Sequence, residues 1–135
     1  MTTAVLTRQL LRIAGAACLF PDVRRDRTMP RYMLQFSYTA QAWAALAKNP
    51  ANRRQLVEGM MKKLGGRLVD LYYHFGEFDG TAIVEAPDDT TAIAAVIAAV
   101  TPGHIKTTRT TRLMTVEETI EAMKKAGTVS LPAPG

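Results

Sequence analysis

Four stretches of the chain alternate between apolar and polar residues with the two-residue period of a half-buried β-strand. In the first of them, Phe36 and Tyr38 share one side while Gln35 and Ser37 share the other. The predicted strands span residues 32–38, 68–75, 81–86 and 105–114. The second and third strands are separated only by a glycine-bracketed turn, so they should form an antiparallel hairpin.

Helical periodicity fills the intervals between these strands. A first helical run begins after Thr39, is interrupted at Pro50, resumes, and ends at Gly65 and Gly66. A second, alanine-rich helix follows Asp88 as its N-cap, and the Thr115–Glu118 spacing predicts a capping box for a terminal helix. The apolar stripes expected to face inward are Ile93, Val96, Ile97 and Val100 on the second helix, and Val116, Ile120 and Met123 on the terminal helix.

The order strand, helix, strand, strand, helix, strand is that of an α+β ferredoxin-like βαββαβ fold with a four-stranded antiparallel sheet and an extra C-terminal helix. Helices would cover one face of such a sheet only. The other face must then meet water, a ligand or a second copy of the chain. We therefore expect a homodimer in which the two uncovered sheet faces meet.

With 135 residues, the chain has room for one compact domain. Residues 1–28 combine a short apolar run with a charged, proline-bounded segment, so we interpret them as a flexible leader or linker. An export signal is the minority interpretation, and Met29 is an alternative start. The predicted domain spans residues 29–127, followed by a tail at 128–135.

Charge and cysteine content narrow the classes of partner. The formal charge is +5, but residues 1–28 supply five arginines and two aspartates, which leaves only +2 on the rest. Because the body has no basic stripe interleaved with aromatic residues, we expect no nucleic acid as a partner. No apolar run reaches the roughly 18 residues of a membrane span. Cys18 is the only cysteine, so a reducing, cytoplasmic location is the default.

Two segments of the sequence, GGRLVDLYYHFGEFDGTAIVEAPDD and GHIKTTRTTRLMTVEE, resemble the GYD domain family of the dimeric α+β barrel group. The resemblance extends over residues 32–126. Phe78 stands where the family commonly has tyrosine, which removes a hydroxyl from the signature. The family implies a fold but no established activity, since relatives by fold include cofactor-free oxygenases, isomerases, haem enzymes and ligand sensors.

The turn within this signature is interpreted first as structural. Gly76 and Gly80 permit turn conformations, Asp79 can accept hydrogen bonds from nearby amides, and Phe78 can pack over the end of the hairpin. The functional alternative makes Glu77 or Asp79 an acid or base at the mouth of a pocket.

His74 is the candidate catalytic residue, because its imidazole titrates near neutral pH and it shares a strand face with Tyr72. The side chains predicted to form a polar, ligand-binding inner face are Tyr38, Tyr72, His74, Glu85 and Arg109, with Gln35 and Ser37 as further donors. His104 follows a turn and is expected to be exposed. The two histidines lack the spacing of a metal site, and no cofactor motif occurs, so we predict neither metal nor cofactor.

Three functions remain open at this point. The first is a small homodimeric domain that binds a small, partly polar organic ligand. The second is a cofactor-free oxygenase or isomerase, with His74 as general base and Arg109 stabilising the developing anion. The third is a structural accessory domain that binds a partner protein.

Overall fold

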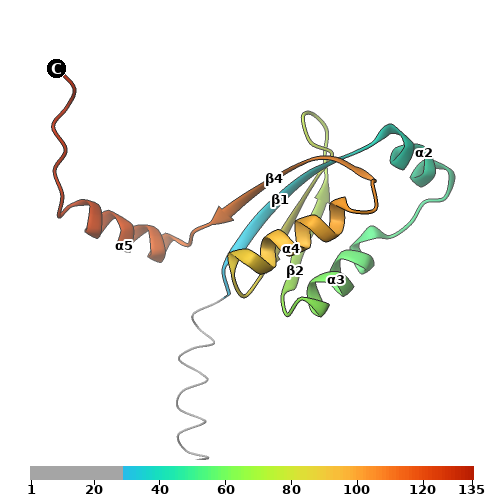
Figure 1. The fold of residues 1–135 in the computed structure, drawn as a ribbon, viewed down its shortest axis with the longest axis horizontal. Helices are drawn as coiled ribbons and strands as arrows, with labels where there is room; N and C mark the ends of the chain where they lie inside the picture. The colour runs from blue at the N-terminus through green and yellow to red at the C-terminus, as the bar shows by residue number, and fades with distance from the viewer. Residues whose placement is uncertain (1–28) are drawn as a thin grey trace, which may run out of the picture.

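Four antiparallel strands form a single sheet in the order β2–β3–β1–β4 (Figure 1). The computed structural model describes residues 29–135. The predicted leader, Cys18 and the question of an alternative start at Met29 concern residues 1–28, which lie outside the described residues, and the proposed division into leader, domain and tail stays a prediction. The strands are β1 (Arg31–Tyr38), β2 (Arg67–Tyr73), β3 (Gly80–Glu85) and β4 (Ile105–Leu113).

The helices also follow the predicted order, so the ferredoxin-like βαββαβ fold is confirmed. They are α2 (Ala40–Lys48), α3 (Arg53–Lys63), α4 (Asp89–Val100) and the additional C-terminal α5 (Val116–Ala126). The interruption expected at Pro50 separates α2 from α3. Strands β1 and β3 occupy the centre of the sheet, and β2 and β4 form its edges.

Helix starts are determined by side chains that accept hydrogen bonds from otherwise unpaired backbone amides. The side chain of Thr39 accepts from the amide of Ala42 at the start of α2, and Asp88 accepts from Thr91 at the start of α4. At α5, Thr115 and Glu118 form the reciprocal capping box that their spacing predicted. These three predicted helix starts are confirmed.

One face of the sheet packs against α3 and α4, and the hydrophobic core lies there. The buried residues of this core are Tyr32, Met61, Leu68, Ala82, Val84, Ala86, Ala92 and Ala95. The opposite face carries no helix from residues 29–135, and we call it the open face. From the strand registers, its central positions are Met33, Gln35, Tyr72, Thr81, Ile83 and Arg109.

Strand β2 departs from strict alternation. Strict alternation would place Leu68 and Leu71 on opposite faces, yet these residues pair with Val84 and Ala82, which both face the core. A register shift between Leu68 and Asp70 inserts one residue and reverses the pattern beyond it. Leu68 and Tyr72, which strict alternation would place on one face, therefore lie on opposite faces.

The inward stripe predicted for α4 is wrong for three of its four residues. Ile93, Ile97 and Val100 are exposed, whereas Ala92 and Ala95 are buried against the sheet. Methyl side chains allow the helix to approach the sheet closely, and the larger side chains are left on its outer surface. We call Ile93, Ile97 and Val100 the α4 ridge.

Helix α5 also differs from its prediction. Val116, Ile120 and Met123 were expected to face inward, but all three are exposed and no residue of α5 is buried. Figure 1 shows α5 continuing beyond the end of β4 and away from the sheet. Across residues 29–135, no helix is both long enough and apolar enough to span a bilayer.

Candidate functional site

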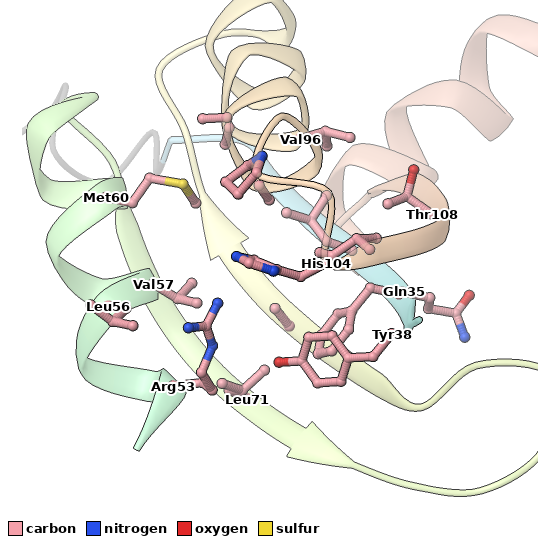
Figure 2. Close-up of a pocket in the computed structure, with 18 of the residues that line it drawn as sticks. Gln35, Tyr38, Arg53, Leu56, Val57, Met60, Leu71, Val96, His104 and Thr108 are labelled. Atoms are coloured by element: carbon pink, nitrogen blue, oxygen red, sulfur yellow. The ribbon is translucent and has the colours of Figure 1, made fainter. Parts of the chain in front are cut away.

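A cavity of about 330 Å³ lies between the core-facing side of the sheet and helices α3 and α4 (Figure 2). Its walls are mostly aliphatic. They include Leu34 of β1, Val57 and Met60 of α3, Leu71 of β2 and Val96 of α4. Binding sites for small organic molecules have volumes of about 300–1,000 Å³ and mainly apolar linings, so this cavity has the size and character of a site for a small ligand.

The alanines of α4 create much of this space. Ala95, Ala98 and Ala99 all line the cavity, and none of them fills it as a leucine would. The helix thus holds its backbone close to the sheet at Ala95 while leaving room beside it. The alanine-rich composition of α4 therefore allows both the close packing on the sheet and the open space of the cavity.

Besides Gln35, Thr108 and Thr110 of the strands, three polar side chains accompany the apolar walls: Tyr38 from the end of β1, Arg53 from the first turn of α3, and His104 from the turn before β4. In Figure 2 all three extend toward the middle of the cavity from different sides. Among residues 29–135, no carboxylate forms an ion pair with Arg53. By contrast, its neighbour Arg54 binds Asp70 at 2.7 Å.

The phenol of Tyr38 is part of an aromatic cluster at one end of the cavity. Its hydroxyl lies 3.3 Å from that of Tyr73, and its ring packs edge-on against Trp43 with centroids 5.2 Å apart. Burial, reinforced by the hydrogen bond with Tyr38, raises the pKa of Tyr73 above its ordinary value. Tyr73 therefore remains a neutral hydrogen-bonding group across the physiological pH range.

The five side chains predicted as one ligand-binding set occupy different places in the single chain. Tyr38 lies in the cavity on the core side, whereas Tyr72 and Arg109 lie on the open face. His74 follows β2 and reaches the same open face, where its Nε2 lies 2.6 Å from the hydroxyl of Thr81. The cavity does not extend to Tyr72, His74, Glu85 or Arg109. A recess formed by two paired open faces stays a prediction.

Most of these polar groups already have partners within the chain. The Tyr72 hydroxyl donates to Asp70, which Arg54 also binds, and these two hydrogen bonds lower the pKa of Asp70. Arg109 lies 3.6 Å from the Glu77 carboxylate, and its guanidinium stands 5.3 Å from the centroid of the Phe78 ring.

Glu85 lies at the other end of the sheet, between two arginines. Arg67 donates two hydrogen bonds to its carboxylate, at 3.1 and 3.2 Å, and Arg31 donates a third at 3.1 Å. These bonds, those of Arg67 foremost, lower the pKa of Glu85 despite its burial. Glu85 therefore closes one end of the β2–β3–β1 pairing as a buried, fully paired carboxylate.

The residues from Gly76 to Gly80 hold the hairpin end against β1 and α2. The Asp79 carboxylate accepts hydrogen bonds from the Tyr38 amide at 2.8 Å and from the Trp43 indole at 2.9 Å, so it binds residues far along the chain rather than its own turn. Gly76 has φ +112°, which favours glycine, and Phe78 is buried. At Gly80, an added Cβ would meet the Phe36 ring at 2.3 Å. These contacts support the structural interpretation of the motif.

Sequence reasoning missed Arg53 and His104 as cavity residues. Arg53 was not among the candidate residues, and His104 was expected to be exposed; His104 is exposed, yet it also lines the cavity. One available signal was the first turn of α3, which carries two arginines and no acidic residue. A cation there is unfavourable in the field of the helix dipole, so a nearby anion would be needed to offset it.

Residues 29–135 contain no group of three or more histidine, cysteine, aspartate or glutamate side chains arranged to hold a metal ion. The polar groups of the cavity include a phenol, a guanidinium and an imidazole. Together they can donate hydrogen bonds and positive charge to an anionic or polar ligand group.

The amino-acid sequence matches one known protein family over most of its length. The profile described as "GYD domain" matches residues 32–123. A protein of Thermus thermophilus, named "Glutamine synthetase and cystathionine beta-lyase binding protein", is 28% identical over 79 residues, which is 58% of this chain and 83% of that protein.

Two solved structures are similar in outline. The crystal structure of TTHA0845, also from Thermus thermophilus, has a TM-score of 0.44 and 15% identity, over 65% of this chain and 96% of that chain. The crystal structure of MtbAldR has a TM-score of 0.42 and 14% identity, over 64% of this chain and 52% of that chain, so the match spans about half of MtbAldR. The fold assignment rests on the strand order described above rather than on these two weak likenesses.

Proposed function

We propose, from the premise that this chain belongs to the GYD domain family, that it is a homodimeric binding domain whose core-side cavity takes a small organic molecule. The ligand has an apolar body and one acidic group. The observation that carries the proposal is Arg53, a cation without a carboxylate partner among residues 29–135, in the lining of a mainly apolar cavity. The homodimer is proposed because helices cover only one face of the sheet.

Affinity and orientation would come from different parts of the cavity. Burying apolar ligand surface against Val57, Met60 and Val96 contributes about 25 cal/mol per Å². A carboxylate placed between Arg53 and the Tyr38 hydroxyl would receive charge-assisted hydrogen bonds, which are about twice as strong as neutral ones. The ligand would therefore be selected for its acidic group and retained by its hydrocarbon part.

The test is calorimetric titration with octanoate and phenylacetate, compared with octanamide and phenylacetamide. We expect the acids to bind more tightly than the amides of the same shape. Arg53→Gln should reduce affinity for the acids about ten-fold or more, since a hydrogen bond to a charged group is worth about 1.5–3 kcal/mol, and should leave the amides unchanged. Arg54→Gln is the matched control, because Arg54 is bound to Asp70 and does not line the cavity.

A second variant tests the position of the site. Ala99→Leu places three extra carbon atoms in the cavity and should abolish binding of acids and amides alike, while the unfolding transition stays cooperative. Equal affinity of wild type, Arg53→Gln and Ala99→Leu would show that binding occurs elsewhere and would refute the proposal.

A second candidate function is the binding of another protein, which the Thermus relative favours by its name. The exposed α4 ridge offers this chain an apolar surface for such a contact. Co-migration of the purified chain with glutamine synthetase or cystathionine beta-lyase in size-exclusion chromatography would support this function, and Ile97→Glu should abolish it if the ridge is the contact. Separate elution at micromolar concentrations would exclude both enzymes as stable partners.

A further inference from the structure

Helix α5 presents an apolar face that nothing in residues 29–135 covers. The exposed fractions of Val116, Ile120 and Met123 are 71%, 43% and 65%. These residues follow one another at intervals of four and three, so they lie on one side of the helix. Glu118, Glu121 and Lys125 lie on the other side, and Glu117 and Lys124 lie at the flank of the apolar row.

An isolated helix of this length is only marginally stable in water. Helices shorter than about 12–15 residues gain most of their stability from packing, and α5 has 11 residues, none of them buried. The capping box contributes about 1 kcal/mol but does not cover the apolar face. The helix therefore requires a surface to pack against.

The α4 ridge is a surface of matching shape. The exposed fractions of Ile93, Ile97 and Val100 are 48%, 60% and 38%, and these residues repeat the intervals of four and three found in α5. Both rows span two helical turns, about 10 Å. Two rows of equal length and spacing can interlock when the helices pack side by side.

We propose that α5 packs on the α4 ridge of a second copy of this chain, with the two helices antiparallel. In that direction Ile120 lies against Ile97. Lys124, in the last turn of α5 and at the flank of its apolar row, then comes close to Asp88 and Asp89, at the start of the partner's α4. The charges fix the direction of packing, and the apolar rows provide its stability, since exposed ion pairs contribute little.

The chain cannot place α5 on its own α4 ridge in this way. Strand β4 ends beside the start of α4, because Arg112 pairs with Tyr32, whose hydroxyl donates to the Asp89 carboxylate. An α5 folded back over its own α4 would therefore run parallel to it and bring Glu117 and Glu118 toward Asp88 and Asp89. These carboxylates would repel one another, and the repulsion would destabilise the parallel arrangement.

The connection is also too short. Only Met114 and Thr115 separate β4 from α5, so the three extended steps from Leu113 to Val116 span about 10 Å. An α5 packed on the outer surface of α4 would have its axis about 8–10 Å beyond the α4 axis, which itself stands above the sheet, so this distance is out of reach. In an exchange with a second copy, α5 does not have to pass over its own α4, because Figure 1 shows α5 already extended away from its own sheet.

Cross-linking between two separately made chains tests the exchange. In a Cys18→Ser background of the full chain, Ile97→Cys and Ile120→Cys are prepared as two single variants, mixed, and treated with a short bismaleimide. We expect a covalent product that contains one chain of each kind. Either variant alone should yield no two-chain product, since positions 97 and 97 of two copies do not meet in this arrangement.

The direction is tested with two further mixtures in the same background. Thr90→Cys with Lys124→Cys should cross-link, as antiparallel packing requires, whereas Thr90→Cys with Glu117→Cys is the matched control and should not. Cross-linking in the Glu117 mixture alone would overturn the antiparallel arrangement. A chain that carries both Ile97→Cys and Ile120→Cys and cross-links only within itself would overturn the exchange, as would the absence of any product.

The exchange goes beyond the proposed ligand site and is independent of it, but it excludes the α4 ridge as the contact for another protein, because the same three side chains cannot pack against both. No residue of α5 lines the cavity, and the α4 residues of the cavity are Ala95, Val96, Ala98 and Ala99 rather than the ridge. Failure of the carboxylate titration would leave the cross-linking result intact, and the reverse also holds.

Discussion

Asp79 connects the glycine-bracketed turn to the rest of the molecule through a single carboxylate oxygen. Tyr38 and Trp43 both donate to it, while the backbone amide of Asp79 donates to the carbonyl of Phe36 at 2.8 Å. The half-buried residue thus joins β1, α2 and the hairpin end. These three hydrogen bonds explain the position of Asp79 in the signature without any catalytic role.

Asp79→Ala should lower the free energy of unfolding by about 1–3 kcal/mol, because the Tyr38 amide loses its acceptor in a buried position. Asp79→Asn is the matched control: it keeps a carbonyl oxygen in place and should cost less. Trp43 is the only tryptophan, so its fluorescence during urea unfolding measures both the stability and the local change. Equal stability of Asp79→Ala and wild type would show that the hydrogen bonds to Asp79 do not stabilise the fold.

Glu85 should make the free energy of unfolding depend on pH in the acidic range. Its carboxyl pKa is lowered in the folded chain from the ordinary value of 4.5, so the folded state favours the ionised form. The stabilisation is therefore present above pH 4.5 and is lost as pH falls toward the lower, folded value. Glu85→Gln should be less stable than wild type by about 1 kcal/mol at neutral pH, and the difference should shrink as the pH falls below 4.5.

Urea unfolding at neutral and acidic pH measures this difference. Glu77→Gln is the control, because Glu77 is paired with Arg109 at 3.6 Å but its side chain is 75% exposed. Such a surface pair contributes little, so its removal should leave both the stability and its pH dependence unchanged. A Glu85→Gln variant that keeps the wild-type pH dependence would show that another group controls it.

At the scale of elements, two glycines near each other in sequence should respond in opposite directions to alanine. Gly59 lies inside α3, and an added Cβ would meet no atom within 4 Å, so Gly59→Ala should raise stability by up to about 1 kcal/mol. At Gly66 the same Cβ would lie 2.3 Å from the carbonyl oxygen of Glu85, which is backbone and must move. Gly66→Ala should cost about 1–3 kcal/mol. The two unfolding midpoints, measured in parallel, provide the check.

The sequence predicted the element order well because caps and glycines are local signals. Thr39, Asp88 and Thr115 begin helices through contacts with the three residues that follow them, and no tertiary information is needed. Which side of an element is buried depends on its neighbours. Helix α4 is apolar on almost every side, so its pattern could not show that the alanines, rather than Ile93 and Ile97, meet the sheet.

The candidate site was harder to predict than the fold for the same reason. Tyr38 could be singled out from the sequence as a polar group, but its grouping with Tyr72 assumed one shared inner face. Tyr38 lines the core-side cavity together with Leu34 and Phe36, whereas Tyr72, beyond the register shift of β2, lies on the open face. Arg53 and His104 join Tyr38 only through the approach of α3 and the β4 turn, which no spacing in the sequence encodes.

For the whole molecule, the open face and α5 are two separate surfaces that each lack a cover among residues 29–135. We expect pairing of open faces to form one kind of dimer and exchange of α5 to join two such dimers. Both contacts are isologous, and we expect their two-fold axes to cross at right angles, which closes a tetramer. Each contact can then be removed without the other.

Met33→Glu places a charge at the centre of the open face, and Ile120→Glu places one on the apolar row of α5. An unpaired charge buried in an interface costs about 3–5 kcal/mol, which corresponds to a loss of affinity of at least about a hundred-fold. Light scattering during size-exclusion chromatography should therefore find a tetramer for the wild type, a dimer for each single variant and a monomer for the double variant. Glutamate at Gln41, on the exposed surface of α2, is the control and should leave the mass unchanged. If Met33→Glu kept the wild-type mass, the open face would not be an interface, and the same result for Ile120→Glu would exclude the exchanged helix.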